Sequence, residues 1–271
     1  MIPILTSILR NIVALYKLFW FVILCLITLP ILGIAKLLFK QSAFFHAIPK
    51  IFHTATCFIF QIKIEVMGRP TDGHVIYVGN HLSYIDIPVL GSVLGAHFIA
   101  KEEVRSWPIF GWLGALSGSI FVSRNREAVS ECIDEIHDMI KIERPLILFP
   151  EGTSSQGTSV LPFKSSLFEL FMDEKFNKTL QIQPLTITVQ RFNDAPMETL
   201  DDMDGYAWHG EMTMVPHLWA LAKSYGANVR IRFFTPHTAS EFSDRKEFAQ
   251  TCHNDVQFGL EENLPLTLDL G

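Results

Sequence analysis

The sequence predicts an α/β fold in which a mixed sheet is flanked by helices, preceded by an N-terminal helical segment that anchors the chain in a membrane. Two observations support this. After residue 60, short apolar runs typical of buried strands alternate with stretches of helical periodicity, which indicates a sheet with helices on its faces. Before residue 60 the chain is unusually apolar, and 271 residues suffice for one large core. We therefore expect a membrane-anchoring segment at residues 1–60 and one domain at residues 61–271.

The anchoring prediction depends on residues 18–35, which hold no charged side chain. A helix of this length extends about 27 Å, close to the roughly 30 Å hydrocarbon core of a bilayer. A secretory signal peptide fits less well, because the run is longer than a signal's apolar core and no small-residue cleavage site follows it. Basic residues flank the run on both sides and give no clear orientation. A single span and a helix pair that dips into one leaflet both stay open.

Prolines interrupt the predicted N-terminal helices. Pro30 and Gly33 predict a kink in the first helix, because proline removes a backbone donor. Residues 39–60 mix many phenylalanines and isoleucines with scattered polar side chains, which predicts an amphipathic or membrane-seated second helix. Pro49 predicts a break within this second helix. We therefore expect two imperfect helices before the globular domain begins.

The globular part alternates between predicted strands and helices. Residues 126–141 place their apolar side chains on one helical face. Residues 193–210 are rich in acidic side chains and predict a loop that forms a lid or insert over the site. Apolar runs predict strands at residues 62–67, 75–78, 97–100, 119–122, 146–149, 180–189 and 229–234.

The overall charge and the cysteines argue against some classes of function. The formal net charge is -6, with 28 acidic and 22 basic residues, so the global electrostatics argue against nucleic-acid binding. The four cysteines are widely scattered and form no CxxC pair, a pattern typical of reduced thiols on the cytoplasmic side. The ten histidines include no HExxH motif. We therefore expect neither a metal ion nor a bound cofactor.

The feature most indicative of chemistry is the pair His81 and Asp86, which follows the apolar run at residues 75–78. A neutral imidazole removes a proton from a hydroxyl near neutral pH, and a nearby carboxylate fixes its tautomer and stabilises the imidazolium. Five residues rotate by roughly 140° along a regular α-helix, so the two side chains meet only if a turn lies between them. Gly79 and Ser83 favour such a turn. The alternative is a capped strand-to-helix turn with a solvated His81.

Two later segments add groups suited to anions. A short apolar strand ends at Arg124, whose guanidinium forms a rigid fork of donors for phosphate or carboxylate. Another strand ends at Pro150 and opens into Glu151, Gly152 and Thr153, where glycine permits a tight turn whose N–H groups can bind an anion. Each segment alone is also compatible with an ordinary strand end.

In this order, the segments resemble the glycerolipid acyltransferase family, typified by 1-acylglycerol-3-phosphate acyltransferases. The NHxxxxD block matches at residues 80–86, the Gly-x-Ile-Phe-x-x-Arg block at residues 118–124, and the Phe-Pro-Glu-Gly-Thr block at residues 149–153. An apolar strand with a central proline, at residues 181–185, resembles a fourth block. Four blocks in order with family-like gaps, spread over residues 60–190, make a strong signal.

The resemblance implies that residues 61–271 form an O-acyltransferase domain, with His81 as general base and Asp86 orienting it. It implies that a lysolipid hydroxyl, such as that of 1-acylglycerol-3-phosphate, accepts a fatty acyl group from acyl-carrier protein or acyl-CoA. It also favours a two-helix anchor at the cytoplasmic face of a bacterial inner membrane. The substrate-binding residues that it implies are Asn80, Gly118, Arg124, Glu151, Gly152 and Thr153.

One departure from the family pattern concerns the acceptor. Members that use phosphate-bearing acceptors usually continue the third block with arginine, and Ser154 stands there instead. Bacterial relatives that acylate lyso-ornithine lipid are similar at this position and at residues 206–212, so such a lipid is the alternative acceptor. A thioesterase that activates water with the same pair is a more distant alternative, because the sequence lacks a GxSxG nucleophile elbow. A non-catalytic scaffold would not require the pair at all.

Overall fold

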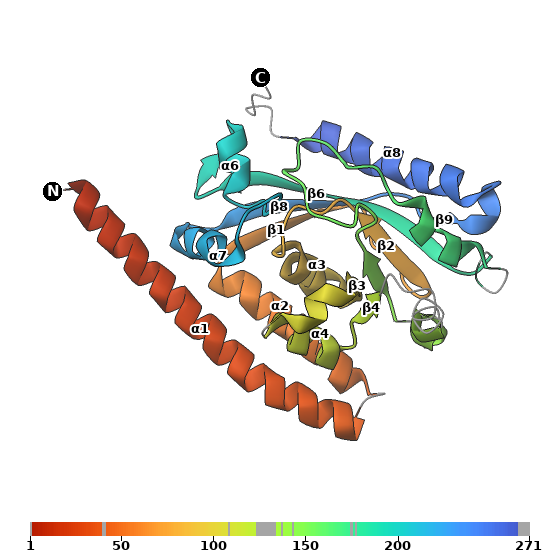
Figure 1. Ribbon diagram of the computed structural model, residues 1–271, viewed down its shortest axis with the longest axis horizontal. Helices are drawn as coiled ribbons and strands as arrows, with labels where there is room; N and C mark the ends of the chain where they lie inside the picture. Colours follow the sequence, from red (N-terminus) through yellow and green to blue (C-terminus); the bar gives the residue numbers. More distant parts are fainter. Residues whose placement is uncertain are drawn as a thin grey trace.

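A mixed sheet runs through the centre of the molecule, with helices on both of its faces (Figure 1). This arrangement confirms the predicted fold class. The computed structural model describes residues 2–39, 42–107, 109–122, 134–136, 138–142, 144–173, 176 and 178–264. The strands are β1 (Ile62–Met67), β2 (Val75–Gly79), β3 (His97–Lys101), β4 (Ile120–Val122), β5 (Leu146–Leu148), β6 (Gln181–Phe192), β7 (Ala195–Pro196), β8 (Ala227–Phe233) and β9 (His237–Thr238). The main helices are α1 (Ile2–Phe39), α2 (Ala43–Ile59), α3 (Asp86–Leu94), α4 (Phe110–Ser117), α6 (Leu200–Asp204), α7 (Met214–Lys223) and α8 (Arg245–Asn263).

The strand order brings several loops to one edge of the sheet. The described strands run in the order β1-β8-β6-β2-β5-β3-β4, and β7 and β9 pair with β6. β2 pairs in parallel with β5 and β6, and β3 pairs in parallel with β5 and β4, whereas β8 runs antiparallel to β6. The carboxyl ends of β2, β3, β4 and β5 therefore lie at the same edge, where ligands commonly bind in open α/β sheets.

The predicted strands are all present, with ends shifted by a few residues. The central strand β2 is buried at all five positions, as expected of a parallel strand covered on both faces. The prediction of a loop at residues 193–210 was wrong in part, because this stretch contains β7 and the short helix α6. Elements of two to five residues are too short for a periodic pattern to reveal. Residues 134–136 and 138–141 of the predicted helix are helical, and its remainder lies outside the described residues.

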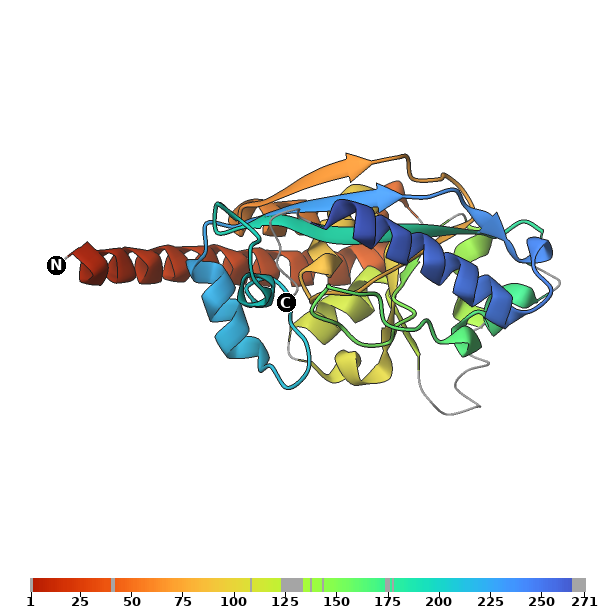
Figure 2. The same cartoon turned by 90° about the horizontal axis from the view of Figure 1, so that it is seen from above.

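Helix α1 lies along one flank of the molecule, and its N-terminal end projects beyond the body (Figure 1, Figure 2). It packs against α2, α4 and α7 and continues through Pro30 and Gly33 without a break. Its other faces expose apolar side chains, and α1 is the described helix that is long and apolar enough to cross a membrane by length and composition. The buried positions recur every three or four residues, as Ala14, Lys17, Phe21, Cys25, Thr28, Leu32 and Ala35.

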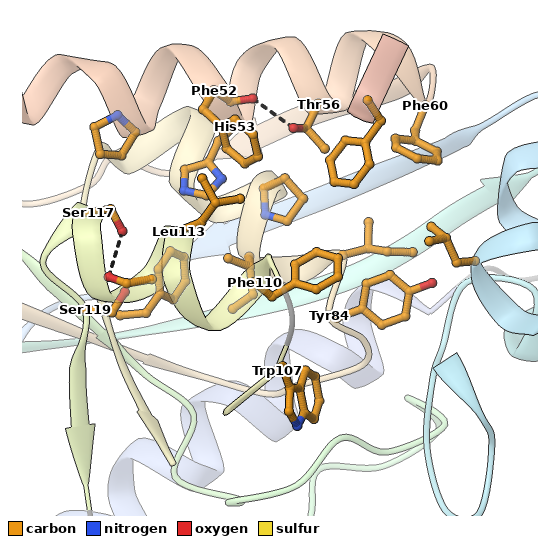
Figure 3. A pocket seen from close by; sticks show the side chains of 18 of the residues that line it. Phe52, His53, Thr56, Phe60, Tyr84, Trp107, Phe110, Leu113, Ser117 and Ser119 are labelled. Carbon is orange, nitrogen blue, oxygen red and sulfur yellow. Dashed lines mark hydrogen bonds between the residues drawn. The ribbon is translucent and has the colours of Figure 1, made fainter. Parts of the chain in front are cut away.

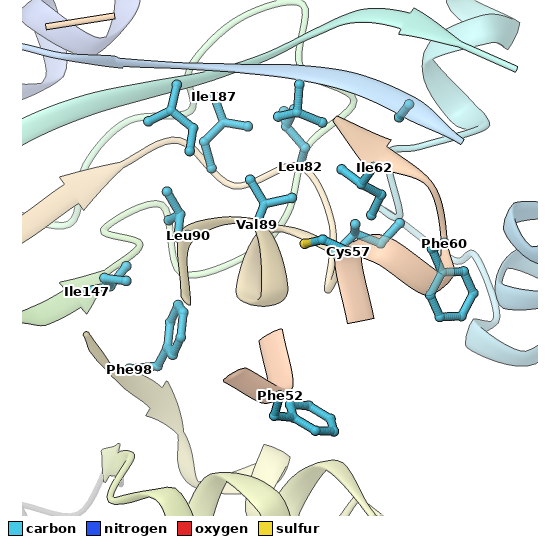
Figure 4. Close-up of a cluster of buried hydrophobic side chains, with 14 of the residues drawn as sticks. Phe52, Cys57, Phe60, Ile62, Leu82, Val89, Leu90, Phe98, Ile147 and Ile187 are labelled. Atoms are coloured by element: carbon cyan, nitrogen blue, oxygen red, sulfur yellow. The ribbon is translucent and has the colours of Figure 1, made fainter. Parts of the chain in front are cut away.

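Helix α2 packs between α1 and α3. Its Phe52 and Cys57 side chains lie among the buried apolar side chains of the core (Figure 4). The predicted break at Pro49 was wrong, since α2 is continuous and the chain turns before it, where the Ser42 hydroxyl accepts a hydrogen bond from the Phe45 N–H. Pro49 is buried, and packing of the surrounding helix offsets the lost backbone bond. The helices before residue 60 therefore pack directly against the elements after it. The predicted division into an anchoring segment and an acyltransferase domain at this residue stays a prediction.

The opposite face of the sheet is covered by α8, as Figure 2 shows. This helix begins at the Asp244 cap, whose side chain accepts hydrogen bonds from the N–H groups of Lys246 and Glu247. Phe248 from α8 packs with Phe168 in a second apolar cluster against the sheet. The sheet is thus covered on both faces, and its carboxyl edge carries the loops that form the candidate site.

Candidate active site

The turns that follow β2 and β5 lie side by side because these two strands are parallel neighbours. The backbone N–H of His81, after β2, donates to Oε1 of Glu151, after β5, over 2.7 Å. The N–H of Ser155 donates to the carbonyl of His81 over 2.8 Å. Two blocks separated by about seventy residues in the sequence therefore form one site at the carboxyl edge of the sheet.

His81 and Asp86 form a hydrogen-bonded pair at the centre of this site. His81 Nδ1 lies 2.8 Å from Asp86 Oδ2, and Asp86 is the first residue of α3. As expected, a turn separates the two residues, so their side chains converge. The imidazole stacks on Phe149, with ring centroids 4.1 Å apart and 12° between the planes. The His81 side chain is 20% exposed, and its Nε2 makes no hydrogen bond within the described part of the chain, so that nitrogen can reach a substrate.

The Asp86 carboxylate is completely buried, yet both of its oxygens have partners. Besides His81, Oδ2 accepts hydrogen bonds from the backbone N–H groups of Leu82 and Ser83, at 2.7 and 2.9 Å. Oδ1 accepts a hydrogen bond from the Tyr206 hydroxyl at 3.0 Å. The N-terminus of α3 adds a favourable helix dipole. These contacts offset the cost of burying a charge, so the carboxylate can hold a proton on His81 Nδ1 and leave Nε2 as the basic nitrogen.

The segment that follows α6 packs against the His81–Asp86 pair. Tyr206 is fully buried, and burial together with the charge of Asp86 raises the pKa of its hydroxyl well above the usual value. The N–H of Trp208 donates to the carbonyl of Leu82 at 2.9 Å, and the Ser154 hydroxyl donates to the Trp208 carbonyl. This segment is therefore hydrogen-bonded to both turns of the site, the one after β2 and the one after β5. Sequence reasoning missed this role, because one sequence holds no signal that links residues 120 positions apart.

Glu151 connects the His81 turn to a more distant loop. Its Oε1 accepts from the His81 N–H, and its Oε2 accepts from the Leu161 N–H at 2.9 Å. Burial raises the pKa of the Glu151 carboxyl to about 7; the two hydrogen bonds oppose this shift, and the charge of Asp86 adds to it. Both oxygens bind backbone, so the geometry favours a positioning role for Glu151. Its predicted contact with substrate stays a prediction.

Two other predicted substrate-binding residues also have internal partners. Asn80 is buried, and its side chain donates to the Ile187 carbonyl at 2.9 Å and accepts from the Ile187 N–H at 2.8 Å. This exchange ties the end of β2 to β6. Gly118 ends α4 with a φ of +90°, a conformation that glycine adopts without strain. Both residues hold the backbone in place, and direct contact with substrate stays a prediction for each.

The remaining predicted residues concern the polar turn and its cations. Gly152 has a φ of +68°, and a Cβ there would lie 2.3 Å from Nζ of Lys164. Thr153 and Lys164 are both exposed, so this turn presents a hydroxyl and an ammonium group to solvent. Arg124 lies outside the described residues, and the strand that leads to it ends at Val122. The structure thus places one cation, Lys164, directly at the turn.

Tyr84 and Ile85, which lie in the turn between His81 and Asp86, form part of the wall of an apolar pocket. Figure 3 shows Tyr84 in this wall. The volume of the pocket is about 140 Å³. The Tyr84 hydroxyl lies 2.8 Å from His217 Nδ1, which fixes this wall. Pockets with mostly apolar walls and few polar groups suit alkyl chains. Much of the remaining wall comes from α1, α2, α4 and α7 and includes Phe21, Leu32, Phe52, Thr56, Phe110, Leu113 and Leu218.

Comparisons with known proteins agree with this chemistry. A protein-family model described as Acyltransferase matches residues 63–188. A lyso-ornithine lipid O-acyltransferase of Brucella abortus is 32% identical over 80% of this chain and 83% of the relative. A 1-acyl-sn-glycerol-3-phosphate acyltransferase of Neisseria meningitidis is 30% identical over 68% of this chain and 69% of the relative.

A solved structure shows the same fold. The crystal structure of the 1-acyl-sn-glycerophosphate acyltransferase from Thermotoga maritima matches with a TM-score of 0.70, covering 95% of this chain and 97% of that one at 21% identity. The sequence relatives and the family model confirm the resemblance that the four blocks suggested. This chain belongs to the acyltransferase family.

Proposed function

We propose that this protein is a membrane-associated O-acyltransferase that moves a fatty acyl group from acyl-carrier protein or acyl-CoA to a hydroxyl of a lysolipid, in phospholipid or related lipid synthesis. The observation that carries the proposal is the His81–Asp86 pair, whose turn contributes Tyr84 and Ile85 to the wall of an apolar pocket. The family and the names of the relatives support it.

In the proposed mechanism, His81 Nε2 removes the proton from the acceptor hydroxyl as its oxygen attacks the thioester carbonyl. Asp86 stabilises the imidazolium and keeps the ring in place through Nδ1. Collapse of the tetrahedral intermediate forms the ester and breaks the carbon–sulfur bond, and the leaving thiol takes the proton from His81. The acyl chain lies in the apolar pocket during transfer. No acyl-enzyme intermediate is required.

Two acceptors fit this mechanism. We propose 1-acylglycerol-3-phosphate, which would be converted to phosphatidate, and Lys164 and Arg124 are the candidate cations for its phosphate. Ser154 favours the second candidate, lyso-ornithine lipid, because a neutral residue suits a zwitterionic acceptor better than a phosphomonoester. Several relatives carry the name lyso-ornithine lipid O-acyltransferase, including one from Rhodobacter capsulatus that is 32% identical over 74% of this chain.

We propose that the anchor lies in one leaflet at the cytoplasmic face of a bacterial inner membrane, and the packing of α1 supports its orientation in the plane of that membrane. The buried stripe from Ala14 to Ala35 rests on α2, α4 and α7, which belong to the globular part. A helix held along the protein surface in this way would carry α4 and α7 into the hydrocarbon if it crossed the bilayer upright. Lying flat, it exposes its apolar faces to lipid and keeps the site at the interface.

The first prediction concerns the base. His81→Ala should lower acyl transfer about 10²–10⁴-fold while the fold and membrane binding persist, because a partly exposed turn histidine contributes little to packing. The matched control is His237→Ala, since His237 lies 2.8 Å from Asp255 and is 19% exposed but lies elsewhere. Turnover is measured with purified protein and acyl-carrier protein thioester. Wild-type turnover by a folded His81→Ala protein would refute the mechanism.

The second prediction separates the acceptors. We expect turnover with 1-acylglycerol-3-phosphate when purified protein receives either acyl-carrier protein thioester or acyl-CoA. The same assay is run with lyso-ornithine lipid, and turnover with that acceptor alone would establish the alternative. A third arm omits the acceptor: release of free fatty acid at the full rate would instead identify a thioesterase.

The third prediction places the acyl chain. Thr56→Phe adds bulk inside the pocket and should shift the preferred donor to shorter chains, measured as kcat/KM across donors of increasing length. Thr54→Phe is the matched control, because both threonines lie on α2 and donate to the carbonyl four residues earlier, at 2.9 and 2.8 Å, but Thr54 is exposed. An equal shift in both variants, or none in Thr56→Phe, would place the chain elsewhere.

The fourth prediction assigns a positioning role to Tyr206. Tyr206→Phe removes the hydroxyl that donates a hydrogen bond to the Asp86 carboxylate. With one donor fewer, the negative charge of Asp86 is less neutralised and stabilises the His81 imidazolium more strongly. The rise of kcat with pH should therefore move to higher pH. Tyr77→Phe removes a comparable buried hydroxyl, which donates to the Thr71 carbonyl at 2.7 Å, and should leave the pH profile in place. Identical profiles in both variants would reduce Tyr206 to a structural residue.

A further inference from the structure

The N-terminal turns of α1 border a polar cavity that the proposed reaction does not use. Thr6, Ser7 and Arg10 continue the stripe of α1 that faces α7, one and two turns before its buried part begins at Ala14. There the stripe is polar and meets an open space of about 430 Å³, which we call the α1–α7 cavity. Its walls are Thr6, Ser7, Arg10, Phe192, Asn193, Ala220, Lys223 and Ser224.

The charges of the α1–α7 cavity are positive. Arg10 and Lys223 both line it, and no aspartate or glutamate is among its described lining residues. The Arg10 guanidinium is held 5.5 Å from the centre of the Tyr225 ring, and the Lys223 ammonium 6.0 Å from that of Trp219. Neither cation forms an ion pair with a residue that the structure describes. Aromatic faces thus position two cations whose hydrogen-bond donors remain available to a ligand.

A third cation near the α1–α7 cavity already has a hydrogen-bond partner. Lys17 is buried, and its Nζ donates to the Ser224 carbonyl at 2.8 Å. This contact ties α1 to Ser224 at the end of α7, which is one of the residues that line the cavity. Lys17 therefore serves the packing of α1, whereas Arg10 and Lys223 lie where the space opens.

The cavity sits at the boundary between polar and apolar surface. On the same turns of α1, Leu5, Ile8, Leu9 and Ile12 are exposed on the other faces of the helix. With α1 flat in one leaflet, these side chains face the acyl chains and the cavity lies beside them, at the depth of the lipid head groups. Phosphate groups are the main anions at that depth.

We propose that the α1–α7 cavity binds the phosphate group of an anionic membrane phospholipid. The Arg10 guanidinium contacts two phosphate oxygens, and the Lys223 ammonium adds a second positive charge. Such a contact would fix the rotation of α1 at the membrane surface and so orient the site. The inference rests on the membrane association proposed above but not on acyl transfer.

The test is flotation of the full-length protein with vesicles of phosphatidylcholine alone or of phosphatidylcholine with phosphatidylglycerol. Arg10→Gln and Lys223→Gln should each lower binding to the anionic vesicles about fivefold and leave binding to the neutral vesicles unchanged. Arg10→Lys should keep part of the binding, because lysine retains the charge but cannot contact two phosphate oxygens as a fork. The matched control is Lys50→Gln, since Lys50 is an exposed lysine of α2 outside the cavity. Equal losses in Lys50→Gln and Lys223→Gln would mean diffuse attraction and would overturn the proposal.

Two further arms separate the possible sources of phosphate and the two proposals. Without vesicles, inorganic phosphate at constant ionic strength should show no saturable binding to the protein in calorimetry. Saturable binding that Arg10→Gln abolishes would assign the cavity to free phosphate and overturn the lipid assignment. Failure of the wild-type protein to bind either kind of vesicle would contradict the membrane association itself. Failure of the cavity variants to change binding would contradict only this inference.

Discussion

The site depends on one buried carboxylate. Asp86 accepts hydrogen bonds from the His81 ring, from two backbone N–H groups of its own turn, and from the Tyr206 hydroxyl. A buried charge with fewer partners would be costly, and the turn that brings His81 back toward α3 would lose its anchor. The parallel pairing of β2 with β5 supplies the second constraint, because it sets the Glu151 turn against the backbone of His81.

Helix α1 and the candidate site share structural parts. Phe21 and Leu32 belong to the buried stripe of α1 and also line the apolar pocket. The opposite wall includes Tyr84, which lies between His81 and Asp86 in the sequence. A chain in the pocket would therefore touch both α1 and the turn between His81 and Asp86. In the proposed function, this continuity lets a fatty chain move between lipid and site without crossing water.

The sequence predicted the regular elements well and the supporting contacts poorly. Strand β2 and the His81–Asp86 pairing could be predicted, because apolar runs and the geometry of a short turn are local properties. The continuity of α2 through Pro49 could not, because packing around that proline offsets the lost bond. The hydrogen bonds from Tyr206 to Asp86 and from Asn80 to Ile187 could not be predicted either, because each joins residues more than a hundred positions apart in the sequence.

The central claim is that Asp86 holds a proton on His81 Nδ1 and leaves Nε2 as the base. The most direct test is ¹⁵N NMR of the histidine side chains in the full-length protein at a pH where activity is maximal, with His81 assigned by its loss in His81→Ala. The account predicts a neutral ring protonated at Nδ1, with Nε2 unprotonated, and a change of this pattern in Asp86→Asn. A ring protonated at Nε2 alone, or a pattern unchanged by Asp86→Asn, would contradict it.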